Sequence, residues 1–308
     1  MGRLLRWTAL IVVVGAAVGW FVTGPDSLDP ARFEGLTGDV ARGATVFAAA
    51  GCASCHTAPD AGPDADGVAL PVLAGGRSFA SAFGTFVAPN ISSDPDVGIG
   101  AWTDGDILTA IMRGVGPDGA HLYPSFPYTA YGRASPQDML DLVAYMRTLP
   151  ADATPIQPHQ LGFPFNIRRA VGLWKLMFRS DDWTLQGDLT DQQARGRYLA
   201  EALAHCAECH TPRNLLGGLR RDQWLAGAPN PVGEGRIPNI TPGVLQWTEG
   251  QIAEYLKSGF TPEFDTAGGE MAEVVRNTAR LTDADRAAIA SYLKAVPAVA
   301  AAPSTSGG

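Results

Sequence analysis

The feature that most constrains this chain is a five-residue motif that occurs twice, as Cys52-Ala53-Ser54-Cys55-His56 and as Cys206-Ala207-Glu208-Cys209-His210. In an exported protein, CxxCH is the attachment site of a c-type haem: the two thiols bond to the vinyl groups of the porphyrin, and the histidine ligates the iron. The two motifs use all 4 cysteines of the chain. The sequence therefore predicts two covalently bound haem c groups, with His56 and His210 as the proximal iron ligands.

Paired cysteines also occur in zinc sites and in thiol redox centres. A zinc ribbon carries its second CxxC pair a short loop after the first. Here the two pairs are far apart in the chain, and a histidine follows each of them directly. Haem attachment is therefore the favoured interpretation.

Composition sets the size and the charge of the folded protein. The chain has 308 residues, 46% of them hydrophobic and 18% charged, which suits two compact domains. Its net charge is −8, and it contains no basic run. We therefore expect no nucleic acid among its partners.

The N-terminal segment reads as a signal peptide or as a membrane anchor. Arg3 and Arg6 precede an apolar run over residues 7–22. The small residues Ala17 and Gly19 lie inside this run, before bulky ones, which disfavours cleavage there. We therefore expect residues 1–24 to remain as a single anchor in the inner membrane, with the N-terminus cytoplasmic and the rest of the chain in the periplasm.

The rest of the chain contains two similar units. The matching segments occur in the same order in both. They are Ala41-Arg42-Gly43 with Ala194-Arg195-Gly196, Pro89-Asn90-Ile91 with Pro238-Asn239-Ile240, and Trp102-Thr103 with Trp247-Thr248. Each unit is expected to close with an apolar helix opened by a capping box, at Ser135 and Asp138 in the first and at Thr282 and Asp285 in the second.

These patterns predict helices joined by long irregular loops, with no strands, because no sustained alternation of polar and apolar residues occurs. The expected divisions are a first haem unit over 36–150, a structured connector over 151–193, a second haem unit over 194–297 and a disordered tail over 298–308. The connector contains bulky apolar residues over 163–178. It is expected to pack across the two units, and a membrane-facing amphipathic helix is the alternative.

Several segments resemble the cytochrome c subunits of bacterial membrane-associated dehydrogenases. Beside the repeated motifs, they are His121-Leu122-Tyr123-Pro124-Ser125-Phe126-Pro127-Tyr128, Phe163-Pro164-Phe165-Asn166-Ile167-Arg168 and Glu270-Met271-Ala272-Glu273-Val274-Val275-Arg276-Asn277. The resemblance covers about residues 36–296 and implies a mainly α fold, with two tandem class I cytochrome c-like domains after the transmembrane helix. It implies a periplasmic or membrane dehydrogenase as electron donor and a cytochrome or terminal oxidase as acceptor. Many family members carry three haems, whereas this chain has motifs for two.

The resemblance also implies roles for residues around the two haems. It places Met271 as the distal ligand of the second iron, and a thioether ligand raises the reduction potential. The carbonyl oxygens of Pro89 and Pro238 are expected to accept hydrogen bonds from His56 and His210. Four further side chains are expected to line the haem edges: Asn90, Trp102, Asn239 and Trp247.

The sixth ligand of the first iron is less evident. The register places Met112 opposite Leu256 and Phe126 opposite Met271, and a phenylalanine cannot ligate iron. His121 is the best remaining candidate in this loop. An open or water-ligated iron is the main alternative, and Tyr123 and Met112 are further ones. We hypothesise a His56/His121-ligated first haem of lower potential, which passes electrons to the second.

The leading functional interpretation is a membrane-anchored periplasmic dihaem cytochrome c that transfers single electrons and catalyses no reaction of its own. If the first iron lacks a sixth protein ligand, a dihaem peroxidase-like enzyme is the alternative. An assembly or sensor subunit would need an output domain, and none is evident.

Overall fold

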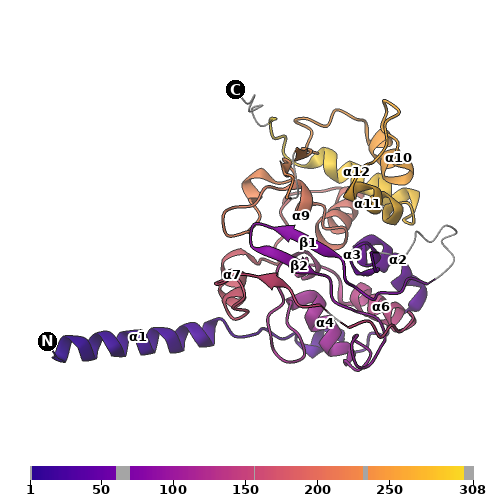
Figure 1. The fold of residues 1–308 in the computed structure, drawn as a ribbon. Helices are drawn as coiled ribbons and strands as arrows, with labels where there is room; N and C mark the ends of the chain where they lie inside the picture. The colour runs from indigo at the N-terminus through magenta and orange to yellow at the C-terminus, as the bar shows by residue number, and fades with distance from the viewer. Residues whose placement is uncertain (1, 60–69, 156, 232–234, 302–308) are drawn as a thin grey trace.

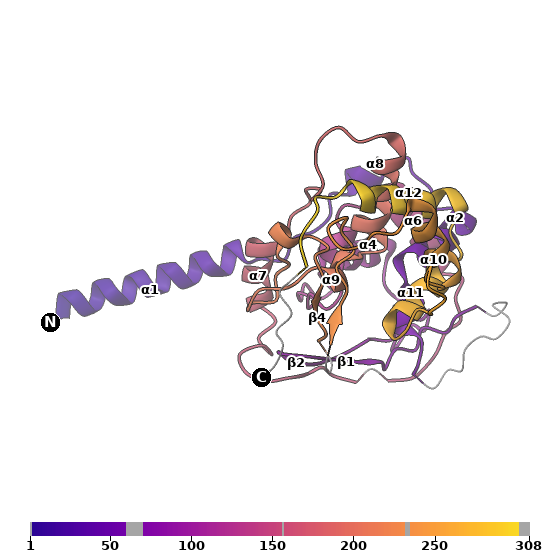
Figure 2. The ribbon, with the colours of Figure 1, turned by 90° about the horizontal axis from the view of Figure 1, so that it is seen from above.

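The structure is a computed structural model that describes residues 2–59, 70–155, 157–231 and 235–301. The N-terminal apolar run forms helix α1 (Gly2–Val22), which has 21 residues, none of them buried. It projects from the rest of the protein as a single rod (Figures 1 and 2). Among the described residues, α1 is the one helix long and apolar enough to cross a membrane.

The remainder is mainly helical, as predicted. A short 3₁₀ turn, η1 (Pro30–Phe33), leads into the first unit. The helices of that unit are α2 (Val40–Ala50), α3 (Cys52–His56), α4 (Asp104–Arg113), α5 (Tyr128–Tyr131) and α6 (Pro136–Met146). Helix α7 (Ala170–Phe178) belongs to the connector. The second unit contains α8 (Asp191–Arg197), the π-helical turn η2 (Tyr198–Leu203), α9 (Ala207–His210), the 3₁₀ turn η3 (Arg221–Gln223), α10 (Glu249–Ser258), α11 (Glu270–Thr278) and α12 (Asp283–Ala295).

The repeated Ala-Arg-Gly segment marks a close helix crossing in each unit. A Cβ atom on Gly43 would lie 1.9 Å from the carbonyl oxygen of Asp141, so α2 can approach α6 closely because position 43 has no side chain. A Cβ atom on Gly196 would lie 1.9 Å from the carbonyl oxygen of Ala288 on α12. The crossings therefore explain why both units carry glycine at this position.

The arginine before each glycine joins the same pair of helices. The Arg42 Nε donates to Asp141 Oδ2 at 2.7 Å, and the Arg195 Nε donates to Asp285 Oδ1 at 2.8 Å. Each first helix is thus held to the last helix of its own unit by one glycine contact and one ion pair.

The repeated Trp-Thr segment marks the start of a helix. Thr103 and Thr248 are the N-caps of α4 and α10, and each forms a complete capping box. Both helices have 10 residues, and both end at a glycine with a left-handed backbone, Gly114 with φ 62° and Gly259 with φ 78°.

The capping boxes predicted at the last helices form only in part. Ser135 and Thr282 accept hydrogen bonds from the backbone nitrogens of Asp138 and Asp285, as predicted. The Asp138 carboxylate, however, accepts from the hydroxyl of Tyr198 in the second unit. Ser135 N also donates to that hydroxyl, at 3.1 Å. The missing half of this box is therefore replaced by a contact between the units.

The expectation of no strands is wrong in detail. β1 (Ser78–Ser81) pairs antiparallel with β2 (Gly84–Val87), which also pairs with β3 (Gln160–Leu161). In the second unit, β4 (Ala228–Pro229) pairs with β5 (Arg236–Ile237). These strands have 2 to 4 residues, too few for an alternating pattern to emerge in the sequence.

The connector packs on both units, as expected. On α7, the Lys175 Nζ donates to the carbonyl oxygen of Gly114 at 2.7 Å in the first unit. The Trp174 Nε1 donates to the carbonyl oxygen of Leu216 at 2.9 Å in the second unit. Helix α7 also lies beside the C-terminal end of α1 (Figure 1).

The tail expected to be disordered is ordered at its start. Val299 N donates to Thr241 Oγ1 at 3.1 Å, and the Asn239 side chain donates to the Val299 carbonyl at 2.9 Å. Residues 302–308 of this predicted tail lie outside the described residues.

Candidate haem sites

Each CxxCH motif forms a short helix, so its two cysteines lie about one turn apart. Gly51, with φ 65°, ends α2 and permits the sharp change of direction into α3. The ring nitrogen Nδ1 of His56 lies 2.8 Å from the carbonyl oxygen of Pro89. The equivalent distance from His210 to Pro238 is also 2.8 Å. Because a carbonyl only accepts, Nδ1 is the donor in both rings, which leaves Nε2 as the nitrogen that would bind iron.

The donor set fits haem c attachment. Burial lowers the pKa of both His56 and His210, which favours the neutral ring that an iron ligand needs. Burial raises the pKa of Cys52 and Cys206 to about 12, the opposite of the lowered pKa of a redox-active CxxC pair. Within the described residues, no three His, Cys, Asp or Glu side chains gather as a zinc-type cluster. Both alternatives to haem therefore lack support.

A repeated Leu-Ala-Gly segment, which the sequence analysis missed, closes the proximal side of each site. Gly75 N donates to the carbonyl oxygen of His56, and Gly227 N donates to that of His210, each at 2.7 Å. A Cβ atom on Gly75 would lie 2.5 Å from the Pro89 carbonyl oxygen. The signal was present in the sequence as Leu73-Ala74-Gly75 and Leu225-Ala226-Gly227.

Asn90 and Asn239 have a structural role, and their expected place at the haem edges stays a prediction. The Asn90 side chain donates to the carbonyl oxygens of Asp152 and Thr154 at 2.8 and 3.0 Å. The Asn239 side chain makes the equivalent bond to Val299. Each asparagine thus ties the loop after Pro89 or Pro238 to the segment that follows the last helix of its unit. Their amide groups are used in these bonds.

Trp102 and Trp247 are half-buried and pack against the hydrophobic core. The carbonyl oxygen of Trp102 accepts from the Arg147 side chain, and that of Trp247 accepts from Lys294 Nζ at 3.1 Å. The backbone of each tryptophan is therefore fixed to the end of the last helix. Their proposed contact with haem stays a prediction.

The loops that carry Phe126 and Met271 have matching backbones. Leu122 N donates to the Gly114 carbonyl at 2.7 Å, and Ala267 N to the Gly259 carbonyl at 2.8 Å. Isolated β-bridges join Val115 with His121 and Phe260 with Thr266. Phe126 N then donates to the Tyr123 carbonyl at 3.1 Å, and Met271 N to the Gly268 carbonyl at 3.2 Å. These pairs place Phe126 at the position of Met271.

The alignment of the two units also corrects which residue of the second unit is equivalent to Met112. Because α4 and α10 have equal lengths between equivalent caps, Met112 stands opposite Lys257 and not opposite Leu256. Met112 and Met139 are fully buried in the hydrophobic core, and Met146 is 7% exposed there. These three methionines therefore pack in the core.

His121, the expected sixth ligand of the first iron, makes two other contacts in the structure. Its Nε2 lies 2.9 Å from the carbonyl oxygen of Thr23, at the end of α1. Its Nδ1 lies 3.2 Å from Lys175 Nζ. Since a carbonyl accepts and an ammonium group donates, Nε2 carries the proton and the lone pair of Nδ1 faces Lys175. Neither nitrogen offers a lone pair to iron, and the side chain instead joins the anchor to α7.

Each haem motif touches the other unit through its third residue. The Asn277 side chain on α11 donates to Ser54 Oγ at 2.7 Å, and the Thr129 hydroxyl on α5 donates to Glu208 Oε1 at 3.2 Å. Arg77, whose Nη1 donates to the Ser54 carbonyl, also donates to both carboxylate oxygens of Glu270 at 2.8 Å. The two motifs therefore lie at one interface, where each unit contacts the haem motif of the other.

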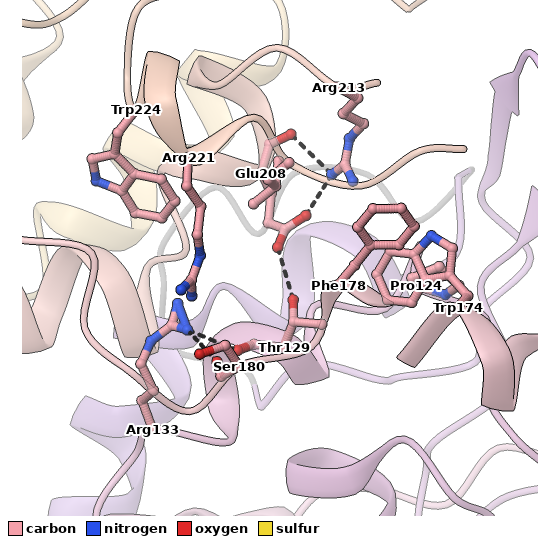
Figure 3. Close-up of a pocket in the computed structure, with 11 residues that line it drawn as sticks. Pro124, Thr129, Arg133, Trp174, Phe178, Ser180, Glu208, Arg213, Arg221 and Trp224 are labelled. Carbon is pink, nitrogen blue, oxygen red and sulfur yellow. Dashed lines mark hydrogen bonds and ion pairs between the residues drawn. The ribbon is translucent and has the colours of Figure 1, made fainter. Parts of the chain in front are cut away.

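A small cavity lies at this interface (Figure 3). Its volume is about 30 Å³, which holds about one water molecule and no organic substrate. Glu208 accepts from Arg213 on one side and from Thr129 on the other, so its carboxylate is already paired (Figure 3). Arg213 is thus paired with Glu208.

Comparison with known proteins agrees with this arrangement. The family model for cytochrome c matches residues 40–150 and 193–297. The diheme cytochrome c-type of Cereibacter sphaeroides is 55% identical over 299 residues, which cover 97% of this chain and 100% of that protein.

Two relatives are named as subunits of dehydrogenases. The fructose dehydrogenase cytochrome subunit of Gluconobacter japonicus is 40% identical over 270 residues, 85% of this chain and 53% of that protein. The alcohol dehydrogenase (quinone), cytochrome c subunit, of Gluconobacter oxydans is 32% identical over 279 residues, 84% of this chain and 55% of that protein. This chain therefore spans about half the length of these two relatives.

Proposed function

Because the chain belongs to the cytochrome c family and carries two haem c groups, we propose that it is a membrane-anchored periplasmic carrier of single electrons from a dehydrogenase towards the respiratory chain. When bound, each haem iron takes up and releases one electron between its ferrous and ferric states. The protein's task is to hold, orient and tune these two groups.

The residues proposed to hold the groups are those of the two CxxCH motifs and Met271. Cys52 and Cys55 would bond the first haem, and Cys206 and Cys209 the second. His56 and His210 would be the proximal ligands, each fixed by its hydrogen bond to a proline carbonyl. The thioether of Met271 would be the distal ligand of the second iron, and it favours the ferrous state.

The observation that carries the proposal is the shared interface of the two motifs. Thr129 reaches Glu208 from one unit, and Asn277 reaches Ser54 from the other. A carrier needs its two redox centres close together, and this interface supports that arrangement.

The proposed place of the protein is the inner membrane, with the haem units in the periplasm. Helix α1 is long enough to span a bilayer. Exposed apolar residues continue from its C-terminal end. They form the α7 surface, which we define as Leu173, Leu176, Met177, Leu215 and Leu216, with exposures of 50% to 97%. Arg169, the N-cap residue of α7, contacts the last turn of the anchor: its guanidinium lies 4.1 Å from the centre of the Trp20 ring. This surface therefore starts at the level where the anchor would leave the membrane.

The divisions proposed for the chain are those of the sequence analysis. They are an anchor over 1–24, haem units over 36–150 and 194–297, and a connector over 151–193. The names of the relatives support a dehydrogenase as the donor. A cytochrome or a terminal oxidase is the proposed acceptor.

Purification of the full-length protein from membranes tests this proposal. We expect a pyridine haemochrome assay to give two haems per chain, and a dehydrogenase to co-purify and reduce both haems when its substrate is added. A preparation in which the co-purifying dehydrogenase leaves the haems oxidised would contradict the proposed donor.

A further inference from the structure

The two ligand loops of this protein have the same backbone and different chemistry at one position. The hydrogen bond from Phe126 N to the Tyr123 carbonyl repeats the bond from Met271 N to the Gly268 carbonyl. The preceding turn and bridge also match. Phe126 therefore replaces the thioether donor of the second unit by a ring that has no lone pair.

The rest of the first ligand loop supplies no side chain that would ligate the iron in place of the thioether. Residues 115–127 include no methionine, lysine or cysteine, and His121 is their one histidine. Both nitrogens of His121 are used, by Thr23 and by Lys175. To turn towards iron, this ring would have to leave the buried Lys175 ammonium group without one of its three hydrogen-bond partners.

Tyr123, a further candidate ligand in the loop, is enclosed elsewhere. The Tyr123 ring lies 4.9 Å from the Arg168 guanidinium, 5.3 Å from the His159 ring and 5.5 Å from the Phe86 ring. These contacts hold Tyr123 in a cluster formed by the β-hairpin and the connector.

Around Phe126 the surroundings are aromatic. Its ring lies 5.8 Å from that of Tyr131 and 6.3 Å from that of Tyr128. The Tyr131 hydroxyl already donates to the carbonyl oxygen of Ala50 at 2.9 Å. Such an aromatic lining can accommodate a small neutral molecule, because that molecule loses little hydration on entering it.

We infer that the first haem iron has no sixth ligand from the protein and that, when ferrous, it binds small neutral ligands such as carbon monoxide and nitric oxide. The bond formed is a coordinate bond from the ligand to iron, and no electron is transferred. The inference rests on haem attachment alone and does not depend on the donor or the acceptor of electrons.

Carbon monoxide titration of the dithionite-reduced, full-length protein in detergent tests this inference. We expect one carbon monoxide per two haems, with the haem total measured independently, and a high-spin ferric EPR signal for half of the iron. Phe126→Met restores a thioether. The carbon monoxide uptake of this variant should therefore fall to none, and its high-spin EPR signal should disappear. Phe126→Leu has nearly the same volume as Phe126→Met but no sulfur, so it should still bind one.

His121→Gln separates this inference from the ligation hypothesis. It should also bind one carbon monoxide, because His121 is not expected to touch the iron. A wild-type protein that binds none overturns the inference, whatever the variants do. Uptake that rises from none to one in His121→Gln would assign His121 as the ligand. Each variant must first contain two haems per chain, which shows that it has folded around them.

Discussion

Lys175 is a buried cation whose charge is balanced by carbonyl dipoles. It is 9% exposed, and its Nζ donates to the carbonyl oxygens of Arg113 and Gly114 at 2.6 and 2.7 Å and to His121 Nδ1 at 3.2 Å. It also lies 4.7 Å from the centre of the Tyr128 ring. The burial that creates these contacts lowers the pKa of Lys175 from 10.5 to about 8.

This lowered pKa makes stability depend on pH. Between pH 8 and 10.5 the unfolded chain binds a proton at Lys175 that the folded protein has lost, so the folded state gains stability as the pH rises through this range. The gain is at most about 3 kcal/mol. In Lys175→Met it is absent. We expect the melting temperature of the wild type, relative to Lys175→Met, to increase from pH 8 to pH 10 in detergent. Parallel curves for the two proteins would contradict the assignment.

Met271 is the proposed distal ligand of the second iron, and its sulfur can be removed with little change in volume. In Met271→Leu the side chain keeps nearly the same volume and loses the sulfur, so the second iron should also become open. Carbon monoxide uptake should rise from one to two per chain, with the haem content unchanged. Uptake that stays at one would show that Met271 does not ligate the iron.

The residues that attach haem could be predicted from the sequence, because CxxCH is a local pattern. The distal side could not be predicted as fully. Whether His121 faces iron depends on the directions of its two nitrogens, and Thr23 and Lys175, which set these directions, are distant in the chain. The structural role of Asn90 was not evident for the same reason, since its partners Asp152 and Thr154 follow the last helix of the unit.

At the scale of elements, the two glycine crossings hold each unit together. Gly43→Ala would bring a methyl group within 1.9 Å of the backbone of Asp141, and backbone cannot turn aside as a flexible side chain can. We expect this change to lower the free energy of unfolding by about 2 kcal/mol or more. Gly105 on α4 is the matched control, because its Cβ atom would approach no atom closer than 3.7 Å.

The control should have the opposite effect. Gly105→Ala is expected to stabilise the protein by about 0.4–1 kcal/mol, since it reduces the freedom of the unfolded chain without strain. Denaturant unfolding followed by circular dichroism measures both changes. Equal effects of the two substitutions would show that the crossing at Gly43 is not tight.

Helices with strong end signals could be predicted from the sequence, and the strands could not. The N-cap residues Ser135 and Thr282 are local signals and begin helices as predicted. The pairing of β2 with β3 depends on residues 160–161, which only the path of the connector brings to Thr85 and Gly84. Such pairing is decided by the tertiary fold.

At the scale of the whole molecule, the anchor and the α7 surface would set how the haem units sit on the bilayer. A Cβ atom on Gly172 would lie 2.4 Å from the Thr23 carbonyl oxygen, so α7 packs closely on the residues that follow α1. His121 adds a hydrogen bond at the same place. The haem units are therefore joined to the anchor through packed residues and not through a flexible linker.

This packing predicts a fixed haem orientation on the membrane. In Leu173→Glu/Leu176→Glu, two charges would enter the proposed contact with the bilayer, so the linear dichroism of the haem bands in oriented bilayers should decrease. Phe264→Glu is the control, because this residue is 89% exposed in the loop between α10 and α11, away from α1 (Figure 1). Unchanged dichroism in the double variant would place the α7 surface outside the membrane.

The two-unit organisation of the molecule was evident in the repeats, but the interface between the units was not. It depends on pairs such as Asn277 with Ser54 and Thr129 with Glu208, which differ in chemistry between the units. A repeat shows what is shared, and these contacts are the part that is not shared.

The central claim is that one chain holds two haems that differ in their sixth ligand, with the second of higher potential. A potentiometric titration of the full-length protein tests it most directly. We predict two one-electron steps: Met271→Leu should lower only the upper step and Phe126→Met should raise only the lower step, each by on the order of 0.1 V within the roughly 0.8 V that axial ligands span. A single step per chain, or an upper step that does not respond to Met271→Leu, would contradict the account.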